Sequence, residues 1–231
     1  MKKIRLLFVL LFALLIVGCS SNEEANTDDA QSSNTDTEQK EEVKEPEQQK
    51  ELTKYEKTLL LISDLFDKNL AYDAGDYIKG DIPKGEYAFV KFEGSWSYYS
   101  EEDAAGNIID NENFDSFGYV YVHAAGNIET SGVLVKTSAL KDLEVKGAKE
   151  LYEALNEQTN WNQSGFYKVG VDITPGKYVV ESMGSGYYAI LSGPVGNNKI
   201  VSNDNFNGKK IITLKEGQYL QLSRATITKS K

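Results

Sequence analysis

Few residues in this chain have the types and spacing that catalysis requires. His123 is the only histidine and Cys19 the only cysteine, so a zinc site would need carboxylates for its remaining ligands. A serine–histidine–aspartate triad could use only His123, and the chain has neither a G-x-S-x-G elbow nor a glycine-rich phosphate loop. We therefore predict that His123 is a polar strand residue, and that the protein has no catalytic residue, cofactor or metal.

Carboxylates are abundant, so a glycan hydrolase that uses two of them remains an alternative, although no spacing selects the pair. The stretches 111–113 (Asn-Glu-Asn) and 203–205 (Asn-Asp-Asn) could each offer oxygens to Ca²⁺. The D-x-[DN]-x-[DN]-G pattern is absent, so Asn/Asp-rich turns are the preferred interpretation. Whether these turns bind Ca²⁺ stays open.

Two glycine-flanked aromatic stretches are the most suggestive surface feature: GSWSYYS at 94–100 and GSGYYAI at 184–190. Strand alternation would place Trp96 and Tyr98 on one face, and would turn Tyr187 and Tyr188 to opposite faces. Core packing is the usual role of such residues. The outward members would form a binding surface for a glycan or a peptide, and the candidates are Trp96, Tyr98, Tyr187 and Tyr188.

The N-terminus predicts export and lipidation. A short basic region precedes an apolar run at 6–17, which is too short for a membrane span of roughly 20 residues. The run ends in Ile-Val-Gly-Cys19, which looks like a bacterial lipobox. We expect a signal peptide at 1–18, a diacylated Cys19, and a location on the outer face of the membrane. An ordinary secretory signal is the alternative.

Residues 20–51 contain eleven carboxylates, three lysines and no aromatic residue. Such a stretch cannot bury enough apolar surface to offset the entropy of ordering, so we expect 19–51 to be a disordered acidic tether behind the lipidated cysteine. The chain as a whole has a formal net charge of −10, which argues against a nucleic-acid partner and against a basic membrane-binding face.

The chain carries an internal echo: GDIPKGEY at 80–87 is answered by VDITPGKY at 171–178. Proline fixes φ and glycine accepts positive φ, so both stretches predict a turn that starts a strand. Pro175 and Gly176 fit the central positions of a type II turn. The residues assigned to these turns are Asp81, Pro83, Gly85, Asp172, Pro175 and Gly176. A catalytic aspartate in each copy is the rival hypothesis.

Each echo follows a helical pattern. Apolar residues at three- and four-residue steps predict a helix over 52–70, with Thr53 and Glu56 as a capping box. A shorter apolar face predicts a second helix over 141–157, weakened by Gly147 if that glycine lies inside it. The period then changes to two. We predict an α+β, mainly β protein of two tandem repeats, 52–140 and 141–231, each one helix plus a small antiparallel β-sandwich or partial barrel.

The second half resembles a poorly characterised family of Gram-positive surface lipoproteins. Their β modules open with VG-x-DI-P-x-G-x-Y and close with NDNF…G-x-Y-L-x-L. Here the match runs through Val169-Gly170, Asp172-Ile173, Gly176, Tyr178, 203–206 and 217–222, and it weakens over 77–136. The resemblance implies a location and a module type, with no residue roles to transfer.

The expected function is therefore non-enzymatic: a membrane-anchored binding or scaffolding module at the cell envelope. Its partners would be the membrane, through the lipid on Cys19, and a cell-wall glycan or an envelope protein. An envelope enzyme and a structural spacer are the alternatives. An enzyme requires a cleft of convergent titratable groups, whereas a binding module requires an exposed patch with aromatic residues.

Overall fold

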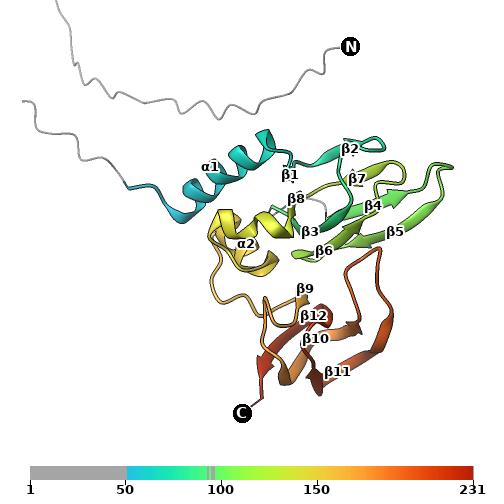
Figure 1. Cartoon of the computed structure of the whole chain (residues 1–231). Coiled ribbons are helices and arrows are strands. Elements are labelled where there is room, and N and C mark those ends of the chain that lie inside the picture. The colour runs from blue at the N-terminus through green and yellow to red at the C-terminus, as the bar shows by residue number, and fades with distance from the viewer. Residues whose placement is uncertain (1–50, 93, 95–96, 231) are drawn as a thin grey trace, which may run out of the picture. The chain divides into compact units, whose positions relative to one another are not determined.

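The computed structural model describes residues 51–92, 94 and 97–230. Over these residues the chain is α+β and mainly β, as predicted, and it has three antiparallel sheets and three helices (Figure 1). The helices are α1 (Lys54–Asp67), the 3₁₀ helix η1 (Thr137–Leu143) and α2 (Ala148–Leu155). No helix in this part of the chain is long and apolar enough to cross a membrane.

The strands form three four-stranded sheets with the orders β1-β8-β3-β6, β2-β7-β4-β5 and β11-β10-β12-β9. The first nine strands are short, whereas β10, β11 and β12 are long and bend through register shifts. Their bounds are β1 Ala71–Tyr72, β2 Gly75–Tyr77, β3 Gly85–Val90, β4 Tyr98–Glu102, β5 Ile108–Asn113, β6 Phe117–Val122, β7 Ile128–Thr130, β8 Val133–Lys136, β9 Gly165–Lys168, β10 Gly176–Leu191, β11 Ile200–Leu214 and β12 Tyr219–Lys229.

The first helix begins as its sequence predicts. Thr53 is the N-cap, and its hydroxyl accepts the Glu56 N–H at 3.2 Å. The Glu56 carboxylate in turn accepts the Thr53 N–H at 2.7 Å, which completes the capping box. Ile62 and Leu65 are buried where α1 packs on η1 and α2. Leu52, which the pattern assigned to the apolar face, precedes the helix and is exposed.

The predicted helix over 141–157 is wrong in its bounds. η1 ends at Leu143, Glu144 adopts a left-handed conformation with φ 56°, and α2 begins only after Gly147. Gly147 is therefore the N-cap of α2 and lies outside the helix interior. The break between η1 and α2 depends on side chains that are distant in the sequence and that occupy the space around Gly147.

Gly85 and Gly176 are the first residues of β3 and β10, with φ of 150° and 144°. These angles favour glycine. Two residues later, the hydroxyls of Tyr87 and Tyr178 donate to the carbonyl of the residue four positions earlier, at 2.8 and 2.7 Å. The same i to i−4 bond is made by Tyr77 and Tyr167, each also two residues after a glycine. These four G-x-Y motifs thus each tie a strand to the turn that precedes it.

Cross-strand neighbours recur in a regular way. At four levels of the sheets, a tyrosine of a central strand lies between one residue of each flanking strand. The triplets are Val120–Tyr87–Lys136, Ile212–Tyr178–Lys229, Glu112–Tyr99–Thr130 and Asp204–Tyr188–Leu222. Residues 111–113 and 203–205 therefore lie in β5 and β11, and the expected Asn/Asp-rich turns are wrong. Pairing with tyrosine-bearing strands outweighs the turn preference of Asn and Asp.

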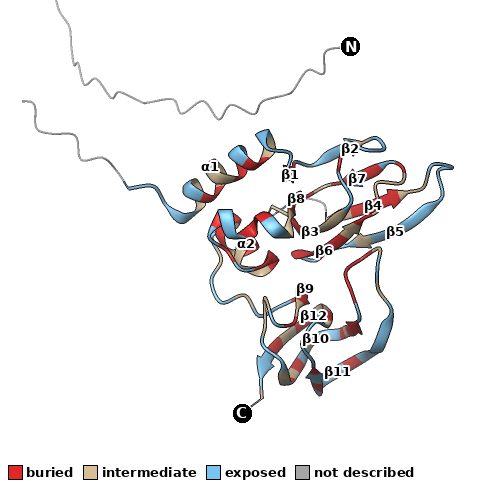
Figure 2. Ribbon diagram, viewed as in Figure 1, coloured by how far each residue is buried: buried red, intermediate tan, exposed pale blue. Residues whose placement is uncertain are grey.

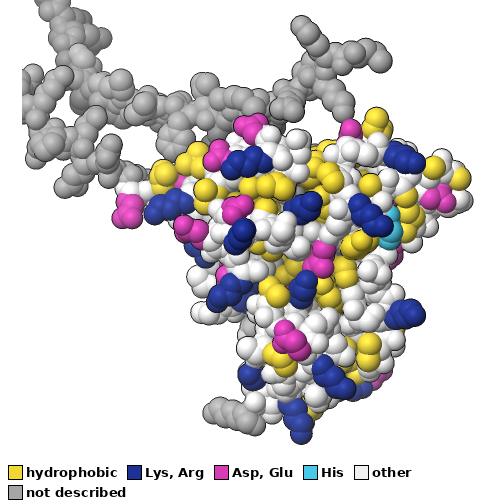
Figure 3. Space-filling view, in the orientation of Figure 1, with side chains coloured by type: hydrophobic (Ala, Val, Ile, Leu, Met, Phe, Trp, Pro, Cys, Tyr) yellow, Lys and Arg dark blue, Asp and Glu magenta, His cyan; other side chains and the backbone are white. Residues whose placement is uncertain are grey.

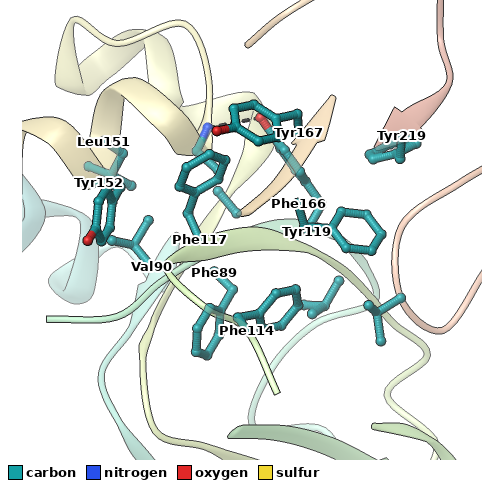
Figure 4. Close-up of a cluster of buried hydrophobic side chains, with 14 of the residues drawn as sticks. Phe89, Val90, Phe114, Phe117, Tyr119, Leu151, Tyr152, Phe166, Tyr167 and Tyr219 are labelled. Atoms are coloured by element: carbon teal, nitrogen blue, oxygen red, sulfur yellow. Dashed lines mark hydrogen bonds between the residues drawn. The ribbon is translucent and has the colours of Figure 1, made fainter. Parts of the chain in front are cut away.

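Buried residues form one continuous core across both halves of the described chain. Phe89 stacks on Phe114 with ring centroids 4.5 Å apart, and Phe114 meets Phe166 of β9 edge to face at 6.0 Å. Phe117 likewise meets Tyr167 at 5.0 Å. Figure 4 shows these rings pointing toward one another. Figure 2 shows buried residues on β4, β6 and β7, whereas β5 and β11 are largely exposed.

Candidate functional site

Alternation along β5 turns Asp110 and Glu112 to the same half-buried face, while Asn111 and Asn113 are exposed. This face of β5 lies against the other half of the chain. The Gln221 side-chain amide of β12 donates to Glu112 Oε2 at 2.9 Å, and the Gly196 N–H donates to Asp110 Oδ2 at 2.6 Å. Two carboxylates of one strand are therefore held between β12 and the loop before β11.

A cleft opens where these elements meet. It consists of two hollows of about 250 and 150 Å³, and both are lined by Glu112, Phe166, Tyr187 and Gln221. The larger hollow is also lined by amide, hydroxyl and charged residues: Asn113, Asp115, Asn205, Ser223 and Arg224. The smaller one reaches Asp110 and Ala189, Leu191, Val195, Asn198 and Ile200. The larger volume suits a small molecule or one or two units of a chain-like ligand.

The Glu112 carboxyl is the most perturbed group in the cleft. Its pKa is raised to about 7, chiefly by burial and in smaller part by the neighbouring charges of Asp110 and Asp115. Hydrogen bonds from the Asn113 N–H at 3.0 Å and from Gln221 act in the opposite direction. Glu112 is thus divided between its neutral and ionised forms near pH 7.

Strand pairing in the β11-β10-β12-β9 sheet brings together the side chains that form the cleft wall opposite Glu112. Tyr187 of β10 lies across from Ser223, and Gln221 lies between Ala189 and Phe166, so these side chains share one face of the sheet. The Tyr187 ring is half-buried, and its hydroxyl accepts the Asn203 amide at 3.3 Å. The larger hollow is therefore lined by an aromatic ring, by two carboxyl residues, Glu112 and Asp115, and by three amide residues.

The aromatic candidates separate into three groups. Tyr187 lines the cleft, whereas Tyr188 is buried against Phe206 beneath it. Tyr98 is half-buried on β4 opposite Asn113 and, within the described chain, does not line the cleft. Trp96 and the lipidation candidate Cys19 lie outside the described residues. Of the described residues among the four predicted candidates, Tyr187 is therefore the one that lines the cleft.

No family model and no curated protein matches this chain. Function must therefore be inferred from the geometry of the cleft and from the chemistry of the groups that line it. Figure 3 shows basic and acidic side chains interspersed over one face of the molecule. That face presents no extended field of one sign to a charged polymer.

Most of the residues that the sequence assigned to turns lie just before β3 and β10. The other two, Gly85 and Gly176, are the first residues of those strands. Pro83 provides the carbonyl that accepts the Tyr87 hydroxyl. Pro175 precedes Gly176, whose φ of 144° differs from the roughly +80° of a type II turn. The predicted turn type is therefore wrong, although the position of the turn is right. The Asp81 carboxylate accepts the Ile78 N–H at 3.3 Å.

Asp172 has a larger structural role than the turn pattern indicates. Its carboxylate accepts the Lys168 N–H at 2.8 Å, the Tyr119 hydroxyl at 2.8 Å and the Lys149 N–H at 3.0 Å. The Tyr119 hydroxyl accepts the Ala148 N–H at 2.9 Å, so two N–H groups of the first turn of α2 are satisfied. Burial raises the Asp172 pKa to about 6 despite these bonds. This cluster caps a helix.

A Cβ atom at Gly147 would collide with this cap, because it would lie 2.7 Å from the Tyr119 hydroxyl and closer still to Asp172 Oδ1. The glycine is therefore required by close approach. Nearby, Lys168 forms a 2.6 Å ion pair with Glu86 and lies over the rings of Tyr119 and Tyr219.

His123 is not a solvent-facing strand edge but the partner of a buried carboxylate. Glu101 is 1% exposed and accepts the His123 N–H at 2.9 Å. His123 Nδ1 lies 3.0 Å from Glu101 Oε2, and the Ala125 N–H lies 3.4 Å from Oε1. These partners satisfy Glu101 and fix the chain between β6 and β7.

A separate hollow of about 330 Å³ lies on the face of β2, β7 and β4. It carries three carboxylates, Asp76, Glu102 and Glu129, beside Ile78 and Asn127. Among the described residues, no group of three or more His, Cys, Asp or Glu side chains could hold a metal ion.

Sequence reasoning considered Glu112 and Asn205 only as possible Ca²⁺ ligands and gave no role to Gln221 or Arg224. Glu112 and Gln221 are 109 residues apart, so no local pattern connects them. The available signal was the alternation in Asp110-Asn111-Glu112-Asn113, which places two carboxylates on one face of a strand.

Proposed function

We propose that this chain is a lipid-anchored extracytoplasmic protein that binds a ligand without catalysis, in the cleft lined by Glu112, Tyr187 and Gln221. The short basic region, the apolar run and the lone Cys19 support export and lipidation. The acidic stretch 20–51 would let the folded part reach away from the outer face of the membrane. A cell-wall glycan is the ligand that we expect.

The observation that carries the binding proposal is the position of Glu112. A carboxyl whose pKa is raised to about 7 opposes folding at neutral pH, because ionisation in the cleft is unfavourable. If the only role of this position were to accept the hydrogen bond from Gln221, a neutral side chain of similar shape would be sufficient. A charge-prone group kept in an open cleft beside an aromatic ring is typical of a binding site rather than of a core.

We further propose that 52–140 and 141–231 are two copies of one β unit, each preceded by a helix. The support is the cross-strand register. Tyr87, Tyr99, Gly85 and their partners correspond to Tyr178, Tyr188, Gly176 and theirs at a nearly constant offset. The short strands β3 and β4 would then correspond to the two halves of β10. The cleft would lie where one copy covers the sheet of the other.

The test is binding of the full-length chain to isolated Gram-positive cell walls. Tyr187→Ala should weaken binding by roughly tenfold or more, because a central aromatic contact is lost. Tyr55→Ala is the matched control, since Tyr55 is also half-buried but lies on α1. Thermal melts should show that both variants remain folded. Wall binding by Tyr187→Ala that equals the parent would contradict the proposal.

Glycan hydrolysis is the second candidate, favoured by the near-neutral pKa of Glu112 and by Asp110 on the same face of β5. A carboxyl that is neutral near pH 7 can act as a general acid, and a second carboxylate can complete the pair. Release of reducing ends from cell walls by the full-length chain, lost in Glu112→Gln, would favour hydrolysis over simple binding.

A further inference from the structure

The charge of the cleft is unbalanced. Three carboxyls line it, those of Asp110, Glu112 and Asp115, and the only cation among its described lining residues is Arg224. Arg224 Nε donates to the Ser185 carbonyl at 2.7 Å, which directs part of the guanidinium to the hairpin of β10. None of the ion pairs between described side chains includes Glu112. A ligand could therefore provide the positive charge.

The remaining walls indicate the rest of the ligand. Asn205 and Gln221 each carry an amide with donors and an acceptor, and Ser223 adds a hydroxyl. The Tyr187 ring offers a flat apolar surface beside them. Paired donors and acceptors next to an aromatic ring suit the hydroxyls and the C–H face of a sugar ring. An apolar peptide side chain would instead need deeper apolar pockets.

Building on the proposed function, we propose that the cleft binds a glycan with free amino groups, that is, an amino sugar without its acetyl group. The ammonium group would lie against Glu112, with Asp110 and Asp115 adding to the attraction. The sugar hydroxyls would bond to the amides of Asn205 and Gln221, and the ring would pack on Tyr187. An N-acetylated sugar offers neither the charge nor the three donors of an ammonium.

Binding of the ammonium should release a proton from Glu112. With a pKa of about 7, Glu112 carries its proton in about nine-tenths of molecules at pH 6. Pairing with an ammonium requires the carboxylate, so the proton leaves Glu112 for the buffer. Asp110, Asp115 and Arg224 are the other charged groups that line the cleft. At pH 6 we expect release of about 0.9 proton per ligand bound.

Calorimetry at pH 6 on the full-length chain, in two buffers of different ionisation enthalpy, measures this release. The probes are a glucosamine hexasaccharide and its fully N-acetylated counterpart. The amino form should bind at least about tenfold more tightly, as a charge-assisted hydrogen bond predicts. In Glu112→Gln the proton release should disappear, and the preference for the amino form should fall several-fold, because only Asp110 and Asp115 then attract the ammonium. Asp204→Asn is the matched control, because Asp204 lies opposite Tyr188 as Glu112 lies opposite Tyr99, but outside the cleft lining.

Equal affinity for the two hexasaccharides, or binding without proton release, would overturn the amino-sugar assignment while leaving glycan binding intact. A lysine hexapeptide that binds as tightly as glucosamine, with the same proton release, would show that charge alone is recognised and would overturn the saccharide assignment. Wall binding that Tyr187→Ala and Glu112→Gln both leave unchanged would instead remove the cleft function itself.

Discussion

Glu112→Gln is expected to stabilise the protein above neutral pH. Folding raises the Glu112 pKa from 4.5 to about 7, so the folded state holds its proton more tightly than the unfolded state does. Below pH 4.5 the carboxyl is protonated in both states and has no net effect. Between pH 4.5 and 7 the unfolded state gains by ionising, so stability falls as pH rises, and above pH 7 the loss is complete.

The size of this loss follows from the pKa change. At about 1.4 kcal/mol per pKa unit, the displacement corresponds to about 3 kcal/mol, which partial exposure of Glu112 lowers to about 2–3 kcal/mol. Glutamine has a similar shape and keeps an acceptor for the Asn113 N–H. At pH 8 the variant should therefore be more stable than the parent by about this amount, and at pH 4 it should be equal to it.

Urea unfolding at pH 4 to 8 measures the effect. With an m-value of roughly 2 kcal/mol/M, the midpoint at pH 8 should rise by about 1 M. Asp172, whose pKa is raised to about 6, makes stability fall with pH in the same sense. The difference between parent and variant isolates Glu112, since Asp172 is present in both. A variant that is less stable at pH 8, or a difference that does not change with pH, would refute the reasoning.

Three further predictions concern other parts of the chain. Gly147→Ala should cost about 2 kcal/mol or more in urea unfolding, because its Cβ would displace the Asp172 cap; a near-neutral effect would contradict the close approach. Tyr87→Phe and Tyr178→Phe should each cost about 1 kcal/mol or somewhat more, since each removes a part-buried hydroxyl bond to a turn carbonyl and Tyr178 also loses its contact with the Thr174 hydroxyl; a loss near zero in either variant would argue against equivalent turns. Cys19→Ala should abolish labelling by a clickable fatty acid, and persistent labelling would exclude Cys19 as the lipidation site.

Local signals in the sequence were sufficient where the interacting residues are close together. Thr53 and Glu56 are three residues apart, and their capping box forms as predicted. Glycine and proline marked the turns before β3 and β10, because those residues restrict the backbone on their own. The change of period from about 3.6 to 2 gave the mainly β class for the same reason.

Predictions failed where distant residues decide the local structure. The helix over 141–157 is interrupted because Tyr119 and Asp172, from elsewhere in the chain, occupy the space around Gly147. Residues 111–113 were expected in a turn, but pairing with Tyr98 and Tyr99 makes them a strand. The cleft joins β5 to β12 across 109 residues, a contact that only the folded chain reveals.

The contact between β5 and the sheet of the second half joins two unlike surfaces. A contact of this kind can also form between molecules and repeat from one molecule to the next. On that sheet Phe166 lies opposite Gln221, whereas in the sheet of β2 and β7 Asp76 lies opposite Glu129. The exposed edge strand β11 of another molecule would bring Asp204 toward Asp76, Glu102 and Glu129. Repulsion between these carboxylates disfavours that addition. The acidic hollow therefore disfavours the docking of an acidic strand such as β11 on this face.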